Sequence, residues 1–384
     1  MKTSNIYYIY NGEDRIDFGN VAALALGGYN TYLIHFSKIK KNGIKKKMVQ
    51  IRDGLGNFKM VEINNIYISP TNYGFEYLKH FEKPDLIIYS GINYPYAFKI
   101  ADMFGDIKKI YYQHVLLKIF KNKFYCQLDK RSLNKVKYSL KAVCSTFQKC
   151  ILGLTSDYTL IQDILDYRFF SSLGFRNLIY TPIIYSMCYN IHNSNNNTNN
   201  WLDFINQYYP YVLSIITLKR EDVSENMEKY AFKVIYNLAI KQKNLNFIII
   251  GSNRAQAENV IKKIPTNIIL LGKIYDDKVM KILYENSLFV IVPFHLSSNR
   301  IIEGLFYYKP ILTTCYPLKL FKGLKNMINI VCEDSFSKYN DLVSLLINDK
   351  VFRDKIRENA KKLYNKHYTY ETFNKYFSKI RPLQ

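Results

Sequence analysis

One stretch decides the fold of this chain: Leu288-Phe-Val-Ile-Val-Pro-Phe-His-Leu-Ser-Ser-Asn-Arg-Ile-Ile-Glu-Gly-Leu-Phe-Tyr-Tyr-Lys-Pro-Ile-Leu-Thr-Thr314. An apolar run ends at Pro293, a short polar loop follows, and Arg300-Ile-Ile-Glu303 begins a segment with helical spacing. Lys309-Pro310 then leads into a second apolar run. Two short apolar runs joined by a helix predict neighbouring strands of a parallel sheet, because a parallel connection needs a crossover of about that length.

The same alternation extends through the second half of the chain. Short apolar runs recur, and residues 227–239 place their apolar side chains at i, i+3, i+4 and i+7, as a helix with one buried face does. Fully apolar strands separated by amphipathic helices are typical of a parallel sheet covered on both faces. We therefore predict a doubly wound α/β domain with strands at Tyr211–Ile216, Asn246–Gly251, Asn267–Gly272, Leu288–Pro293, Ile311–Thr314 and near Ile328–Cys332.

The first half repeats this pattern less regularly, and a polar tract, Asn193–Asn200, separates the halves. Past Tyr339, helical patterns follow at about 338–348, 350–366 and 370–380. The expected strands of the first half are Asn5–Tyr10, Asp85–Ser90, Lys109–His114, Ile151–Thr155 and Leu178–Ile184. The predicted organisation is a domain over 1–190, a linker over 191–209, a domain over 210–366, and a C-terminal helix in 367–384 that packs back toward the first domain. Open parallel sheets bind ligands at their strand C-termini, so a site between the domains is expected.

Composition and charge narrow the class of protein. The 384 residues carry 54 Lys+Arg against 31 Asp+Glu, a formal net charge of +23, and 48% are hydrophobic, which excludes a disordered tail protein. The charge predicts attraction to nucleic acid, an anionic membrane or phosphorylated substrates. The six Cys form no Cys-x-x-Cys pair, which argues against zinc and disulfide scaffolds. Without a signal peptide or an apolar run of about 18–20 residues, we expect a cytoplasmic protein that at most lies on a membrane.

The opening stretch resembles the retaining GT-B glycosyltransferases of family 4. That family has a strand ending in Pro, a loop, a Glu-Ala helix and Gly-Lys-Pro-Val, and the counterparts here are Ile302-Glu303-Gly304 and Lys309-Pro310-Ile311. Phe247–Gly251 is similar to its apolar strand ending in Gly, and Ile269–Ile274 to its Leu-Gly turn. The likeness runs in order over about 211–370 and implies a GT-B fold, with two doubly wound Rossmann-like domains facing across a cleft.

The resemblance implies a donor site in the second domain. Glu303 would accept hydrogen bonds from a ribose diol, although a carboxylate in the first turn of a helix is also a common stabilising feature. Arg and Lys suit the donor diphosphate because its charge must be balanced as it leaves. Two positions depart from the family: His295 stands where a first Glu is common, and Tyr308 where Gly precedes Lys-Pro. The implied donor-binding residues are Glu303, Arg300, Lys219, Arg220, Gly251, His295 and Asn299, with Arg254 as an alternative cation.

The first domain resembles the family more faintly. Lys83-Pro-Asp85 looks like its Lys-Pro-Asp strand, and the run ending at His114 is similar to a strand whose final His contacts the donor sugar. His114 is therefore the implied catalytic residue, against the alternative of a structural histidine. Gly19 and Asn20 follow the first strand, where the family places a Gly-containing loop on the acceptor and phosphate side.

The predicted function is transfer of a sugar from a nucleoside diphosphate donor, a UDP- or GDP-sugar, to an unidentified acceptor, as in a hexosyltransferase. The resemblance implies retention of configuration. The sequence has no Asp-x-Asp pair, so no metal and no further cofactor is expected. Two alternatives stay open: a catalytically weak GT-B-shaped module that binds nucleic acid or another polyanion, and another GT-B-shaped enzyme such as an epimerase or phosphorylase.

The positive charge is concentrated in two segments of the first half. Lys38–Arg52 holds seven basic residues and no acid, and Ile107–Cys150 holds eleven with one acid, Asp129. Apolar and aromatic residues interleave the second segment, as in a helix or loop that lies on a membrane. These segments predict docking on an anionic membrane or a lipid-linked acceptor, with a solvated lysine-rich face as the plain alternative and nucleic acid as the least favoured partner.

Overall fold

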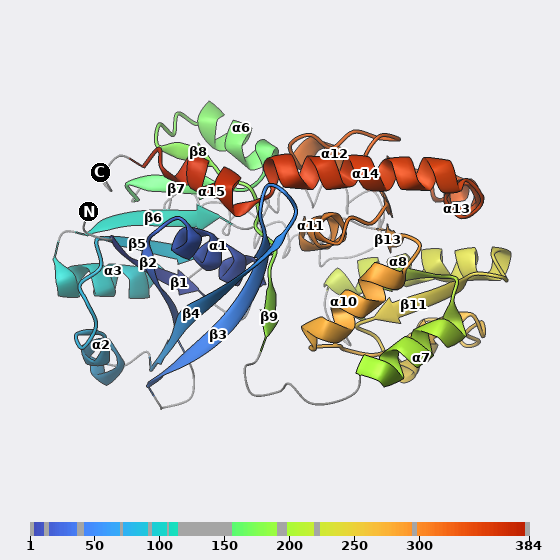
Figure 1. The fold of residues 1–384 in the computed structure, drawn as a ribbon, viewed down its shortest axis with the longest axis horizontal. Coiled ribbons are helices and arrows are strands. Elements are labelled where there is room, and N and C mark those ends of the chain that lie inside the picture. The colour runs from blue at the N-terminus through green and yellow to red at the C-terminus, as the bar shows by residue number, and fades with distance from the viewer. Residues whose placement is uncertain are drawn as a thin grey trace, which may run out of the picture. The chain divides into compact units, whose positions relative to one another are not determined.

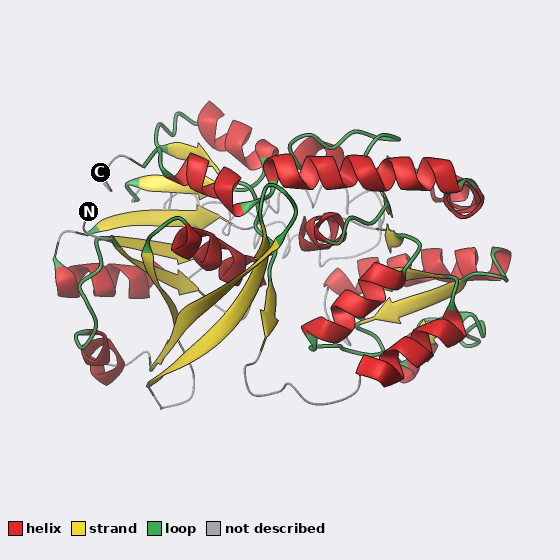
Figure 2. Ribbon diagram, in the orientation of Figure 1, coloured by secondary structure: helices red, strands yellow, loops and turns green. Residues whose placement is uncertain are grey.

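The computed structural model describes residues 4–10, 15–36, 42–69, 72–90, 94–105, 107–113, 156–189, 198–218, 223–293 and 298–380. The chain divides into two compact units. Unit 1 comprises Met1–Ile191 and Tyr368–Gln384, and unit 2 comprises His192–His367. Figure 1 labels the helices and strands, and Figure 2 separates them by type.

Unit 1 is built on a nine-stranded sheet in the order β8-β7-β6-β5-β1-β2-β4-β3-β9. Its strands are parallel except β3, which is antiparallel to both β4 and β9. The strands are β1 Asn5–Tyr10, β2 Asn30–Phe36, β3 Gly43–Arg52, β4 Phe58–Ile68, β5 Leu86–Ser90, β6 Lys108–Gln113, β7 Tyr158–Ile161, β8 Leu178–Tyr180 and β9 Met187–Tyr189. The helices are α1 Arg15–Leu26, α2 Asn72–Leu78, α3 Tyr94–Phe104, α6 Ile164–Ser172 and α15 Tyr370–Phe377.

Strand β1 shows why this sheet is apolar on both faces. Side chains alternate along a strand, so Ile6 and Tyr8 join one core cluster while Tyr7 and Ile9 join the other. The first cluster also contains residues of α1 and α15, and the second contains residues of α2 and α3. Because both faces are covered, β1 is buried along its whole length.

Unit 2 holds a six-stranded parallel sheet in the order β12-β11-β10-β13-β14-β15. Helix α8 contacts β11 and packs on α13, while α11 contacts β13 and β14 and packs on α14. The strands are β10 Tyr211–Ile215, β11 Asn246–Ile250, β12 Ile268–Leu270, β13 Val290–Val292, β14 Ile311–Thr313 and β15 Val331–Cys332. The helices are α7 Thr198–Tyr208, α8 Val223–Lys241, α9 Arg254–Glu258, α10 Asp277–Asn286, α11 Ser298–Phe306, α12 Pro317–Leu320, η1 Phe336–Lys338, α13 Tyr339–Asn348 and α14 Lys350–His367.

The strands expected in the second half are confirmed, as are the three C-terminal helices. The segment 198–208, expected as linker, forms helix α7 instead. Its apolar residues recur at helical spacing, and the polar tract before it hides that pattern. In unit 1 the expected strand at Ile151–Thr155 lies outside the described residues.

The basic segment Lys38–Arg52, in which no strand was expected, forms strand β3 over residues 43–52. Its lysines are held by neighbours on the sheet. Lys45 lies over the ring of Tyr67, Lys47 over the ring of Phe18, and Lys46 pairs with Glu62 at 2.6 Å. Within Ile107–Cys150, residues 108–113 form β6, and residues 114–150 lie outside the described residues.

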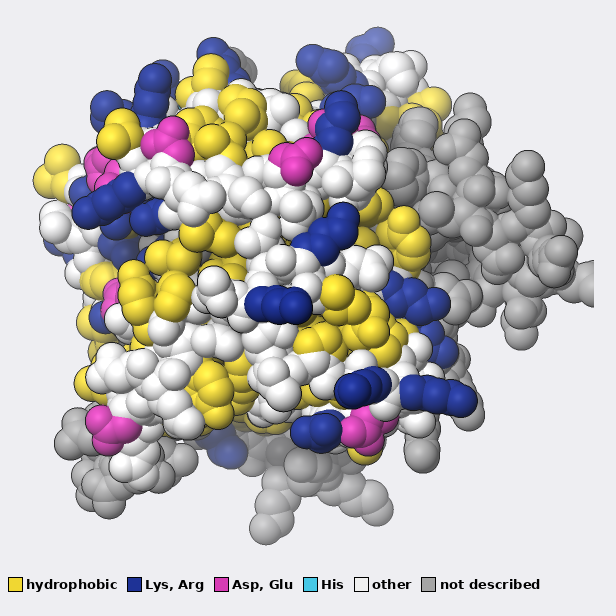
Figure 3. Space-filling view, turned by 90° about the vertical axis from the view of Figure 1, so that its right-hand side faces the viewer, with side chains coloured by type: hydrophobic (Ala, Val, Ile, Leu, Met, Phe, Trp, Pro, Cys, Tyr) yellow, Lys and Arg dark blue, Asp and Glu magenta, His cyan; other side chains and the backbone are white. Residues whose placement is uncertain are grey.

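Figure 3 shows how charge is distributed on one face of the molecule. On the face drawn in Figure 3, Lys and Arg side chains lie scattered among hydrophobic and uncharged polar ones, with fewer acidic side chains between them. Among the residues that the structure describes, no helix combines the length and apolarity that crossing a bilayer requires.

A buried carboxyl pair follows β7 in unit 1. Asp163 is the N-cap of α6, and its Oδ1 accepts a hydrogen bond of 2.7 Å from the backbone N–H of Asp166, which is also buried. Burial, and then the nearby Asp166 carboxylate, raise the pKa of Asp163 to about 8. The folded state therefore binds this proton more tightly than the unfolded chain, and the stabilisation is lost as pH rises from the ordinary value of 3.8 toward 8.

Asp163→Asn should remove that pH dependence. Asn caps a helix as well as Asp and carries no charge to bury, so the variant should be more stable than the wild type at pH 8, and its advantage should grow between pH 5 and pH 8. Urea unfolding at several pH values between 5 and 8 measures the difference. Asp276→Asn, at the exposed N-cap of α10, is the matched control and should leave the profile unchanged. An advantage for Asp163→Asn that does not grow with pH would contradict the explanation.

Candidate functional site

The order of strands in unit 2 gives a candidate position for a ligand. From β10 the chain runs outward to β11 and β12, then crosses back to β13 on the other side of β10. Open parallel sheets bind ligands where the strand order reverses, beyond the carboxyl ends of the two central strands. Here that point lies between β10 and β13, so the described residues 216–218 and Pro293, which directly follow these strands, border it, and helix α11 is the next described element after Pro293. Residues 219–222 and 294–297 lie outside the described residues.

Helix α11 brings together two of the predicted donor residues. Glu303 is fully buried, and its Oε2 accepts a hydrogen bond of 2.8 Å from Nη1 of Arg300, whose side chain is 35% exposed. The two residues are three apart, so they occupy the same face of the helix. Asn299 lies one position before Arg300 in the first turn. A buried carboxylate held by an accessible guanidinium is an arrangement that can receive hydroxyl groups and a phosphate together.

Gly304, next to Glu303, explains how closely α11 approaches the sheet. A Cβ at this position would stand 2.8 Å from Cδ1 of Ile311 in β14. The small residue therefore allows the helix to pack closely on the strand.

Gly251 and Ser252 join the carboxyl ends of three strands. Gly251 has φ of +102°, and a Cβ there would lie 2.7 Å from the carbonyl oxygen of Ile216. Ser252 Oγ donates to that carbonyl at 2.6 Å and accepts from the N–H of Leu218 at 2.9 Å. The Gly251 N–H donates to the carbonyl of Gly272 beyond β12. This bonding fixes the backbone that leads from β10 toward Lys219 and Arg220.

Sequence reasoning missed Ser252, which is fully buried and links the ends of β10 and β11. The signal was present in the Gly-Ser pair that directly follows the apolar run Phe247–Ile250. A small hydroxyl residue at a strand end commonly bonds the backbone nearby.

The Lys309-Pro310 motif is structural in this chain. The buried Lys309 ammonium donates to the carbonyls of Glu285 and Ser287, both at 2.8 Å, at the end of α10. Burial lowers the pKa of Lys309 to about 8. Tyr308, which replaces the family's Gly, has φ of +55°, a conformation that Gly adopts without strain. Lys309 precedes β14, so it lies at the amino end of that strand, opposite the ligand-binding edge.

The expectation that Gly19 and Asn20 belong to a loop is wrong. Both lie within helix α1 and are buried against the sheet. A Cβ on Gly19 would stand 2.1 Å from the carbonyl oxygen of Ile184, and Asn20 Nδ2 donates to the Tyr8 hydroxyl at 3.2 Å. The link between β1 and α1 is residues 11–14, which contain Gly12 and lie outside the described residues. The Asn11-Gly12 pair was the turn signal in the sequence.

Three predicted donor residues, Lys219, Arg220 and His295, and the predicted catalytic His114 also lie outside the described residues. Arg254, the alternative cation, pairs with Glu258 at 2.8 Å on α9. The part of the chain that the structure describes contains no group of three or more His, Cys, Asp or Glu side chains arranged to hold a metal ion.

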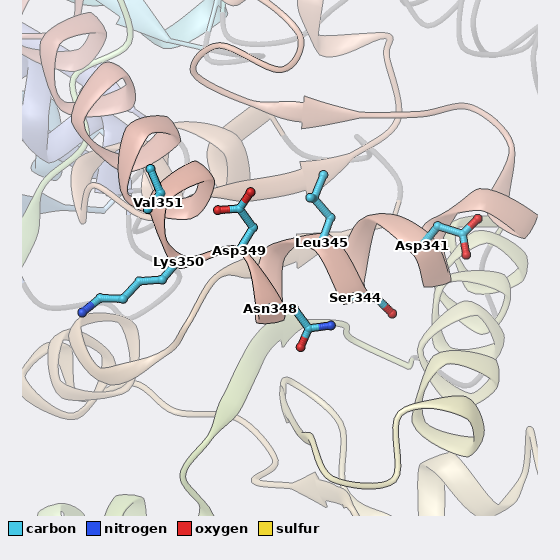
Figure 4. A pocket seen from close by; sticks show the side chains of 7 residues that line it. All are labelled: Asp341, Ser344, Leu345, Asn348, Asp349, Lys350 and Val351. Carbon is cyan, nitrogen blue, oxygen red and sulfur yellow. The ribbon is translucent and has the colours of Figure 1, made fainter.

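A separate shallow pocket lies along α13 and the start of α14. Figure 4 shows its lining, with Asp341, Ser344, Leu345 and Asn348 on α13, and Asp349, Lys350 and Val351 at the junction with α14. None of these residues belongs to the candidate donor site.

Two Rossmann-like units, each with a largely parallel sheet, give this chain the GT-B fold. The Anabaena protein HepE, solved with UDP and glucose, aligns over 98% of both chains with a TM-score of 0.61 and 10% identity. Sucrose-phosphate synthase from Thermosynechococcus elongatus aligns over 98% of both chains, with a TM-score of 0.64 and 9% identity. A putative UDP-N-acetylglucosamine 2-epimerase from Listeria monocytogenes covers 97% of this chain and 94% of its own, with a TM-score of 0.55 and 11% identity. A scan against protein-family models finds no match, and a search of curated proteins finds no relative.

Proposed function

We propose that this protein is a glycosyltransferase that moves a sugar from a nucleoside diphosphate donor to an acceptor. The observation that carries the proposal is the buried Glu303 with its Arg300 partner on α11, beside the point where the strand order of unit 2 reverses. The GT-B fold supports it, because HepE and sucrose-phosphate synthase share that fold.

Glu303 and Arg300 would bind different parts of the donor. The Glu303 carboxylate accepts hydrogen bonds from the ribose hydroxyls, and the partly exposed Arg300 guanidinium turns toward the diphosphate. Lys219, Arg220, Asn299 and His295 would surround the same ligand, with Gly251 holding the backbone beside it. Electrostatic stabilisation of the leaving diphosphate is then the main catalytic contribution of this unit.

The finer features of the proposal rest on the resemblance of the sequence motifs to those of glycosyltransferase family 4. They are a UDP- or GDP-hexose donor, retention of configuration, a reaction without a metal ion, and a sugar contact from His114. HepE has been solved with UDP-glucose, which supports a uridine nucleotide as the first donor to test. We place the reaction in the cytoplasm, where free thiols such as those of Cys315 and Cys332 persist.

A thermal-shift panel with UDP, GDP, ADP and their sugar conjugates tests the proposal. A nucleotide at a hundred times its Kd stabilises the protein by about 2.7 kcal/mol, which raises the Tm of a unit of this size by roughly 5–10 °C. Uridine and guanosine are the controls and should give much smaller shifts, because the diphosphate supplies most of the contact. If no nucleotide raises the Tm, the donor site is wrong.

Epimerisation of a nucleotide sugar is the second candidate, and the Listeria protein favours it because that protein shares the fold over almost the whole chain. Incubating UDP-N-acetylglucosamine with the protein, without an acceptor, separates the two activities by NMR. A new epimer that appears without release of UDP would replace the transferase proposal. None of the structures named above is described as a nucleic-acid-binding protein, so the comparisons give no support to that alternative.

A further inference from the structure

A basic surface extends along α14 of unit 2 and the segment Pro317–Ile328. Helix α14 contains seven Lys and Arg against two Asp and Glu. Pro317–Ile328 contains three lysines, at 319, 322 and 325, and no acidic residue. All three are exposed.

The two segments lie side by side (Figure 1). Asn359 Nδ2 on α14 donates to the carbonyl of Ile328 at 3.0 Å, and a Cβ on Gly323 would stand 2.6 Å from Cδ1 of Leu363. Residues of α14 that are four, three and four positions apart lie on one face of the helix, and this face includes Asn359, which contacts the loop. The members of that face are Lys355, Asn359, Lys362 and Lys366. The lysines of the loop and the helix therefore form one surface.

Two apolar side chains stand at the tip of the loop. Met327 is 43% exposed and Ile328 is 46% exposed. The tip is held rigidly, because Asn326 exchanges two hydrogen bonds with the Cys332 backbone and Asn329 Nδ2 donates to the Gly323 carbonyl. Met327 is also kept at φ of +56°, a conformation that costs about 1–2 kcal/mol. The fold thus maintains a strained loop that presents apolar side chains to water.

Lys325, Lys355 and Lys362 contrast with the lysines of β3. Nothing in the described structure pairs them with a carboxylate or an aromatic ring, whereas Lys45, Lys46 and Lys47 have such partners. Charges of one sign without internal partners raise the local potential and attract an anionic surface.

We propose that the α14 surface docks the protein on an anionic lipid bilayer. This surface consists of Lys319, Lys322, Lys325, Lys355, Lys362 and Lys366 with the apolar tip Met327-Ile328. The lysines lie against the lipid phosphates while the two apolar side chains enter the headgroup boundary. The tip favours a bilayer over nucleic acid, because a phosphodiester backbone gains little from two aliphatic side chains. The proposal does not depend on the enzymatic activity.

Vesicle co-sedimentation tests the docking. The wild type should bind vesicles of phosphatidylcholine mixed with phosphatidylglycerol and should not bind phosphatidylcholine alone. Lys355→Gln with Lys362→Gln should lower the partition coefficient by about 30-fold, since each lysine contributes about 1 kcal/mol near an anionic surface. Ile328→Ser should lower it by about fivefold without changing the charge.

The matched control is Lys262→Gln with Lys263→Gln, which removes the same charge from two other exposed lysines of unit 2. The control should bind as the wild type does, and every variant should keep the wild-type Tm. Equal losses in both double variants would show a general charge effect and overturn the proposal. Loss of vesicle binding only in the Lys45→Gln, Lys47→Gln double variant would also overturn the proposal. The same holds if the wild type binds duplex DNA but not vesicles.

Discussion

Replacing Glu303 with glutamine should weaken nucleotide-sugar binding by about 10- to 100-fold while leaving the fold intact. Two charge-assisted hydrogen bonds to a ribose diol are together stronger than two neutral ones by about 2 kcal/mol, which lies within that range. Glutamine keeps the shape and helix propensity of the side chain, and Arg300 is exposed enough to be hydrated when its partner becomes neutral. Isothermal titration with the best nucleotide from the thermal-shift panel measures the loss.

Glu258→Gln is the matched control for Glu303→Gln. Glu258 also pairs with an arginine on the same unit, Arg254 on α9, but that pair is exposed. Removing an exposed ion pair changes stability by about 0.2–1 kcal/mol, and nucleotide binding should be unchanged. If Glu303→Gln binds nucleotide as tightly as the wild type, the carboxylate does not contact the ligand.

Gly19→Ala should destabilise unit 1 by about 3 kcal/mol. Alanine is the better helix former by about 1 kcal/mol, yet its Cβ would stand 2.1 Å from the carbonyl oxygen of Ile184. That contact is with backbone, which cannot rotate away as a side chain can, so α1 and the segment around residue 184 must move apart. Urea unfolding followed by circular dichroism measures the effect.

Gly43→Ala is the control in the same unit. Nothing lies within 4 Å of a Cβ at Gly43, so this change should alter stability by less than about 1 kcal/mol. A Gly19→Ala variant that is as stable as Gly43→Ala would mean that α1 is not packed against residue 184 in this way.

The strands that the sequence predicts best are those buried on both faces. Strand β10 is apolar except for the buried Ser214, and β11 is apolar except for Asn246 at its start, so a nearly continuous apolar run marks each strand. Strand β3 was missed because Lys45, Lys46 and Lys47 interrupt it. Those lysines belong to a strand because their stems and charges lie over aromatic rings or beside Glu62, and such partners come from residues distant in sequence.

At Gly19, tertiary packing overrides the local preferences of the sequence. Gly and Asn in succession are typical of turns, and a glycine inside a helix is unfavourable in isolation. Here the close approach of α1 to the Ile184 carbonyl demands a residue without a side chain. The position of residue 184 relative to residue 19 depends on the whole of unit 1, so the sequence near Gly19 contains no sign of it.

At the candidate site, the motif Arg300-Ile-Ile-Glu303 indicated both residues but not the hydrogen bond between them. Their spacing allows a contact on one helical face, and burial of the carboxylate makes the pairing necessary, because a buried charge without a partner is costly. The role of Lys309 was likewise hidden, because its two acceptors are carbonyls at the end of α10 that no sequence pattern reveals.

Amide hydrogen exchange with and without a saturating nucleotide sugar tests the placement of the donor site in unit 2. We expect slower exchange in peptides that cover residues 216–222 and 293–306, on both sides of the point where the strand order reverses. Glu303→Gln should reduce that protection at the same nucleotide concentration. Protection confined to residues 341–351 of the separate pocket, or to the Lys309 end of the sheet, would contradict the placement of the donor site.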